Sequence, residues 1–126
     1  MAALNENAIT RVATVAIVDM KTAGKTTLYT VPAGKTFIPS IVVVRNPSTN
    51  LAGGTDYDFG AGANADTWRQ GVDLSSMTAA TDYIAITGEY ISKYAVCGAG
   101  SEFGIKVNTG AGDPVTATVD VLGYLI

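Results

Sequence analysis

The feature that most constrains this chain is a series of short apolar runs rich in β-branched residues, separated by clusters of Gly, Pro, Asn and Asp. Such runs are typical of β-strands, and the turn formers between them reverse the chain. The runs occupy residues 11–20, 27–31, 36–46, 56–59, 82–87, 90–97, 102–107 and 115–124, with a further short candidate at 68–72. About eight strands with almost no helical periodicity predict an all-β, antiparallel two-sheet sandwich that is jelly-roll-like.

Local features refine this prediction. Residues 1–10 are polar and without periodicity, which indicates an extended N-terminal arm before a single sandwich domain at 11–126. The run 11–20 is apolar almost throughout, which predicts an inner strand that is buried on both faces. Because Pro39 has no amide hydrogen to donate, it predicts an edge position or a bulge before Ile41.

The run 115–124 has the clearest alternation in the chain. The residues expected to face the core are Val115, Ala117, Val119 and Val121, and those expected to face outward are Thr116, Thr118 and Asp120. The one helical element that we expect is a single turn through residues 76–80, capped by Asp73 or Ser75.

Composition limits the chemistry. The 126 residues fit one domain and include no histidine and one cysteine. Since histidine is the commonest general acid/base and metal ligand, we expect neither an enzyme nor a cofactor or metal. The formal net charge of −3 argues against nucleic acid as a partner. Charged residues make up 15% and hydrophobic ones 48%, which suggests that part of the surface is covered by another protein or another copy.

No targeting or membrane segment is evident. Residues 1–7 lack the basic start and apolar stretch of a secretory signal. The longest apolar candidate, residues 41–44, is far shorter than the roughly 20 residues that a membrane helix needs. We therefore expect a soluble protein that assembles in the cytoplasm.

Two Gly-Lys-Thr triplets, at residues 24–26 and 34–36, match the end of a phosphate-binding loop. The glycine that this motif requires five residues earlier is replaced by Asp19 and Tyr29, and neither triplet begins a helix. Both triplets are therefore expected to form ordinary hairpin turns.

An acidic cluster around a glycine loop offers oxygen ligands for calcium as a weaker alternative to solvated surface acids. Its members are Asp56, Asp58, Asn64 and Asp66. Gly60 comes too early for a calcium loop, and Thr67 stands where a bidentate glutamate belongs. A carboxylate pair for glycoside hydrolysis is a third reading, drawn from Asp56, Asp58, Glu89, Glu102 and Asp113, and we favour surface acids over it.

Three further sets of side chains are candidates for chemistry, binding or the core. Cys97 lies in an apolar run without a histidine to activate it, which predicts a small buried side chain. Trp68 and Arg69, at the end of a glycine-rich loop, are candidates for contact with a partner. Tyr57 and Phe59 share one face of a strand and are expected in the core.

Three stretches carry a family resemblance: residues 27–36 (TLYTVPAGKT), 42–48 (VVVRNPS) and 119–126 (VDVLGYLI). The chain resembles small β-sandwich virion proteins of tailed bacteriophages, which decorate or cement the head or sit on fibres. The closing residues 122–126 are also similar to the last strand of trimeric jelly rolls such as the tumour necrosis factor and complement head domains.

The resemblance implies a capsid decoration (cement) protein of the virion. It would be assembled in the host cytoplasm as a homotrimer and would bind the major capsid protein or another virion protein. The alternative is a receptor- or glycan-binding head of a phage fibre, with Trp68, Tyr57 and the acids of residues 56–66 at a shallow sugar site. The residues expected to bind the partner are Leu4, Asn5, Trp68, Arg69, Tyr124, Leu125 and Ile126.

Overall fold

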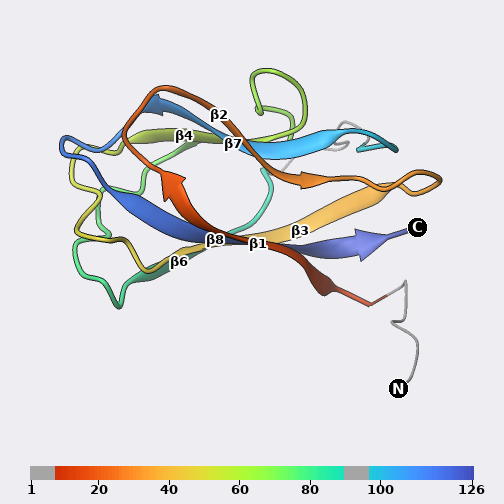
Figure 1. Ribbon diagram of the computed structural model, residues 1–126, viewed down its shortest axis with the longest axis horizontal. Coiled ribbons are helices and arrows are strands. Elements are labelled where there is room, and N and C mark those ends of the chain that lie inside the picture. Colours follow the sequence, from red (N-terminus) through yellow and green to blue (C-terminus); the bar gives the residue numbers. More distant parts are fainter. Residues whose placement is uncertain (1–7, 90–96) are drawn as a thin grey trace.

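Eight strands form two four-stranded antiparallel sheets that pack face to face in a computed structural model, which describes residues 8–89 and 97–126 (Figure 1). Sheet A contains, in order, β1 (Thr10–Asp19), β8 (Thr116–Leu125), β3 (Phe37–Arg45) and β6 (Tyr83–Ile86). Sheet B contains β2 (Gly24–Thr30), β7 (Glu102–Thr109), β4 (Asp56–Gly60) and β5 (Arg69–Val72). The predicted two-sheet sandwich is confirmed.

The connections follow the jelly-roll plan. Consecutive strands cross from one sheet to the other, except for β4 and β5, which pair as neighbours in sheet B. The first and last strands, β1 and β8, lie side by side in sheet A, and Thr10 pairs with Gly123. In the part of the chain that the structure describes, no helix is long and apolar enough to span a membrane.

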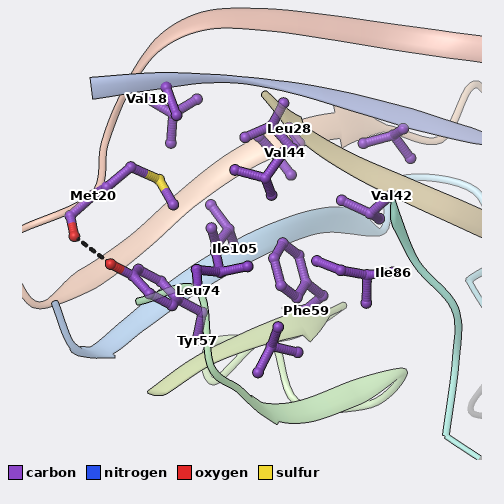
Figure 2. Packing of buried hydrophobic residues seen from close by; sticks show 14 of the residues in the cluster. Val18, Met20, Leu28, Val42, Val44, Tyr57, Phe59, Leu74, Ile86 and Ile105 are labelled. Carbon is purple, nitrogen blue, oxygen red and sulfur yellow. Dashed lines mark hydrogen bonds between the residues drawn. The ribbon is translucent and has the colours of Figure 1, made fainter. Parts of the chain in front are cut away.

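The core lies between the sheets and is formed by their inner faces (Figure 2). Tyr57 and Phe59 of β4 are fully buried, as predicted from their shared face. The Tyr57 hydroxyl donates a hydrogen bond of 2.7 Å to the carbonyl of Met20, and burial raises the pKa of Tyr57 to about 12. This bond satisfies the one polar atom of a large side chain in an apolar interior, so the ring stays in place.

Strand β8 confirms the alternation predicted for it. Val115, just before the strand, and the alternate β8 residues Ala117, Val119 and Val121 are buried, and Thr116 and Thr118 are partly exposed. Asp120 lies between two inward residues and therefore on the outer face, yet it is 7% exposed. Polar neighbours cover it there, as described below.

Strand β1 corrects the prediction of an inner strand, because it forms the edge of sheet A. Its register slips between Arg11 and Ala13 and again between Val15 and Val18. Each slip places extra residues outside the ladder, so an apolar run that looks buried on both faces leaves Ala16 and Ile17 exposed.

Of the two arrangements predicted for Pro39, an edge position or a bulge, the structure has the bulge. Strand β3 lies inside sheet A, between β8 and β6, and its register shifts between Pro39 and Ile41. The bulge removes the demand for an amide hydrogen that proline cannot supply.

The predicted helical turn at residues 76–80 is wrong. Asp73 does accept hydrogen bonds from the hydroxyl and the amide of Ser75. Both bonds lower the pKa of Asp73, and the hydroxyl bond contributes more. However, Asp82 accepts the amide hydrogens of Thr78 and Ala79, which folds the segment into turns. The strand predicted at residues 90–97 lies outside the described residues except for Cys97, which makes an isolated bridge to Phe37.

Candidate interaction surface

The outer face of sheet A is apolar over much of its area. Residues that pair across antiparallel strands point to the same side of the sheet. Ile41 pairs with Leu122, Ile38 pairs with Tyr124, and Val43 pairs with Asp120 on that side. All of these except Asp120 are half-buried. The face therefore offers aliphatic and aromatic atoms to whatever covers it.

The most exposed large apolar side chains lie on the same sheet. Among the described residues, those that are more than half exposed are Ile9, Ile17, Tyr83 and Ile126. Ile17 and Tyr83 lie in β1 and β6, at opposite edges of sheet A. Ile9 precedes β1 and Ile126 follows β8, so both lie near the pair Thr10–Gly123. The four side chains thus lie at the two edges of sheet A and near one end of β1 and β8.

A charged cluster lies within this apolar face. The Arg45 Nε donates to Asp120 Oδ2 at 2.7 Å, and the Thr14 hydroxyl donates to Asp120 Oδ1 at 2.8 Å. Burial raises the pKa of Asp120, but hydrogen bonds from Arg45 and Thr14 and the charges of Arg45 and Arg11 outweigh it and hold the pKa below its ordinary value. The carboxylate therefore remains charged and bound across β1, β8 and β3, which fixes the register of those strands.

The outer face of sheet B is polar, and its side chains bind one another. Asn108 donates to Asp58 at 2.8 Å, and Asp58 also accepts the Gly71 amide hydrogen at 2.9 Å. Lys106 donates to Asn64 at 3.0 Å. Asp58 and Asn64 of the candidate calcium site are thus engaged in hydrogen bonds, and within residues 8–89 and 97–126 no group of three His, Cys, Asp or Glu residues is positioned to hold a metal ion.

The first Gly-Lys-Thr triplet is not a turn: it begins strand β2, and the Lys25 ammonium donates to the carbonyls of Gly62 and Glu102. The second triplet follows the prediction. Gly34 has a φ of 75° in a turn closed by a hydrogen bond from the Lys35 amide to the Pro32 carbonyl. No helix begins after either triplet, so neither has the helix N-terminus that a phosphate-binding loop requires.

The candidate partner residues are separated by the fold. Tyr124 is half-buried on the outer face of sheet A, and Ile126 is exposed beyond the end of β8. Leu125 packs against the core. Arg69 belongs to sheet B, where its guanidinium donates to the Thr87 carbonyl. Leu4 and Asn5 lie outside the described residues.

Trp68, a candidate for contact with a partner, lies in the core of the sandwich. Its side chain is 4% exposed, and its ring meets that of Phe103 edge to face with 5.7 Å between the ring centres. Tyr57 is also in the core. The sugar site suggested for a fibre head therefore loses both of its aromatic side chains. After the glycine-rich loop, the Trp68 amide donates to the Phe59 carbonyl at 3.1 Å, which brings the chain back to β4, and the indole belongs to the core cluster.

Cys97 is buried as predicted, with 3% exposure, and burial raises the pKa of its thiol. The residue that sequence reasoning missed is Ile17. An apolar side chain in an apolar run gives no sign of exposure, and the bulge that turns it outward depends on the pairing of β1 with β8.

These features define a class of protein, an eight-stranded jelly-roll sandwich with one apolar and one polar outer face. No protein-family model matches the sequence, and no curated protein matches it. Among solved structures, the fold is similar to a chain in the acidic stable capsid structure of Helicobacter pylori bacteriophage KHP30. The TM-score is 0.54 at 13% sequence identity, over 94% of this chain and 95% of that one. The likeness extends over the whole sandwich and concerns the fold.

Proposed function

We propose that this chain is a structural protein of a tailed-phage virion that decorates the head and cements it. The observation that carries the proposal is the fold match over almost the full length of both chains with a component of a phage capsid structure. The jelly roll is a common architecture of viral capsid proteins, which agrees with that match. Fold likeness alone does not fix a role, so the surface must supply the rest of the argument.

The outer face of sheet A supplies it. A decoration protein acts through adhesion, and adhesion requires apolar surface that is left uncovered in the free subunit. Ile17 and Tyr83 provide such surface at the edges of this sheet, and Ile126 provides it just beyond β8, at exposures of 79%, 70% and 55%. The partner that we propose is the major capsid protein or another virion protein, reached after assembly in the host cytoplasm.

We further propose that the protein is a homotrimer in which Tyr124, Leu125 and Ile126 lie near the subunit contacts. Ile126 exchanges two backbone hydrogen bonds of 2.9 Å with Thr36, which holds the end of the chain on the fold. An exposed apolar side chain on a fixed backbone is well suited to a subunit contact, because little conformational entropy is lost when it is buried.

The test is binding to heads. Expanded heads are prepared from a virus that carries a nonsense codon in this gene, and the purified protein is added back. We expect saturable co-sedimentation, a higher temperature of head disruption, and a free protein mass of three times 12.9 kDa by light scattering. A monomer that leaves the heads unbound and equally labile would contradict the proposal. The fibre-head alternative loses support because Trp68 and Tyr57 are buried, and glycan-array binding by the same sample would revive it.

A further inference from the structure

Ile17 combines two unfavourable features. It lies in the bulge of β1, between the pairs Val15–Val119 and Val18–Ala117. Its φ is 60°, in the left-handed region, and 79% of its surface is exposed. A β-branched residue is a rare outlier at positive φ because its Cβ substituents crowd the backbone. Exposure removes the packing that would compensate for this strain.

The other described residues with positive φ have simple explanations. The non-glycine ones are Asn46 and Ala65 besides Ile17. Asparagine tolerates this backbone readily, and Ala65 is small and fully buried in its loop. Glycine or asparagine at position 17 would suit both the bulge and the solvent better than isoleucine. The side chain therefore has a use that the isolated fold does not reveal.

We propose that Ile17 anchors a docking contact, inserting its side chain into an apolar pocket of a different virion protein. The inference rests on the proposed function and assigns one anchor point on the surface of the subunit. The Ile17 side chain is 79% exposed in the bulge, and the exposed Ala16 beside it lets a partner approach closely. A branched aliphatic side chain next to a small residue fits a narrow apolar pocket.

Edge-to-edge pairing with a second copy is a poor use of this position. Pairing of β1 strands requires a regular ladder, and the bulge with its left-handed residue interrupts that ladder. Residue 17 therefore suits insertion into a different virion protein better than the addition of β1 to the sheet of another copy.

A second contact point fits the same partner. Tyr83 pairs with Arg45, Arg45 pairs with Thr118, and Thr118 lies opposite the bulge. Tyr83 and Ile17 thus end one row across sheet A. Three strand spacings of about 4.8 Å separate them by about 14 Å. The charge of Arg45 between them is already matched by Asp120, so a partner that spans both anchors need not supply an opposite charge.

The first test separates strain from binding. Ile17→Asn and Ile17→Gly relieve the strained backbone, so we expect the melting temperature of the isolated protein to rise by about 2–4 °C. The same variants should bind heads at least tenfold more weakly. Thr27→Asn, an exposed change on β2 of sheet B, should leave head binding unchanged. A lower melting temperature for both Ile17 variants, or unchanged binding, would overturn the inference.

The second test identifies the partner in the particle. Residue 17 is replaced by the photo-crosslinking residue p-benzoylphenylalanine, and assembled virions are irradiated, with the same replacement at residue 27 as the control. A crosslink from residue 17 to a capsid protein supports both proposals. A crosslink to a tail or fibre protein supports the inference and contradicts the decoration role. A crosslink to a second copy, or none from protein that is present in the particle, overturns the inference and leaves the decoration role intact.

Discussion

The two outer faces of the sandwich differ in how their side chains are satisfied. On sheet B, Asp58, Asn108 and Lys106 have hydrogen-bond partners within the same molecule. On sheet A, the aliphatic side chains of Ile41 and Leu122 are half-exposed, and Ile17 projects from the edge. Both sheets are four-stranded and antiparallel, so the difference in polarity between their outer faces comes from the residues that point outward. The polar face is well solvated as it stands, whereas covering the apolar face with another surface lowers the free energy of the system.

Asp120 adds a second contrast. It is the one buried charged side chain among residues 8–89 and 97–126, and it belongs to the apolar face. Its bonds to Arg45 and Thr14 join three neighbouring strands. Asp58 of sheet B, by comparison, is partly exposed and accepts hydrogen bonds from Asn108 and from the Gly71 amide. Charge on sheet A therefore sets strand pairing, and charge on sheet B keeps the surface solvated.

The largest effect that we expect comes from placing a charge on the apolar face. Ile41→Lys should weaken head binding by about 100-fold, or about 2.7 kcal/mol, because the ammonium would lose its water when the face is covered. Its effect on folding should be small, since a lysine stem covers apolar surface and carries its charge to solvent. Co-sedimentation with heads measures the first effect, and thermal melting measures the second.

The matched control is Thr27→Lys on sheet B, which adds the same charge to an exposed strand position. It should bind heads as the wild type does. If the two lysines weaken binding equally, the contrast between the faces fails. If only Thr27→Lys weakens it, sheet B is the docking face.

The next effect concerns stability. Asp120→Ala removes the shared partner of Arg45 and Thr14, and we expect a loss of about 2 kcal/mol in the free energy of unfolding. This is less than for a fully buried pair because the Arg45 side chain, 34% exposed, can turn to solvent. Asp58→Ala on sheet B removes bonds to Asn108 and Gly71 at the surface and should cost about 1 kcal/mol or less. Urea denaturation of both variants decides, and equal losses would show that the two faces hold their charges alike.

Much of the fold could be predicted from the sequence because turn formers and strand alternation are local signals. Strand β8 shows this, since its inward residues alternate without a break. Pro39 limited its strand to an edge position or a bulge, because the lack of an amide hydrogen is a property of the residue itself, and the structure has the bulge. Strand β1 could not be placed, because an apolar edge strand with two bulges has the composition of an inner strand.

The site was less accessible to sequence reasoning because exposure depends on tertiary contacts. Trp68 follows a loop of small residues, and nothing local shows that Phe103 receives its ring. Asp120 occupies an outward position in the alternation, and its burial depends on Thr14 and Arg45, 106 and 75 residues away along the chain. The family resemblance, and no local pattern, points to Tyr124 and Ile126 as partner contacts. Tyr124 lies on sheet A and Ile126 lies just beyond it, and their contact with a partner is a proposal.

The smallest effect is the dependence of stability on pH, and it too is assigned to sheet A. The folded-state pKa of Asp120 lies below its ordinary value despite burial, because Arg45 and Thr14 bind the charged form. Its stabilisation is therefore fully present above the unfolded pKa of about 3.9 and is lost as pH falls through the folded value. Asp120→Asn should be less stable than the wild type at pH 7, and the difference should shrink as the pH falls from about 4 toward 2. Since the chain has no histidine, the difference should stay constant between about pH 6 and 8. Urea denaturation at a series of pH values measures this. A difference that persists unchanged at pH 2 would mean that Asp120 stabilises sheet A through its shape and hydrogen bonds, with no contribution from its charge.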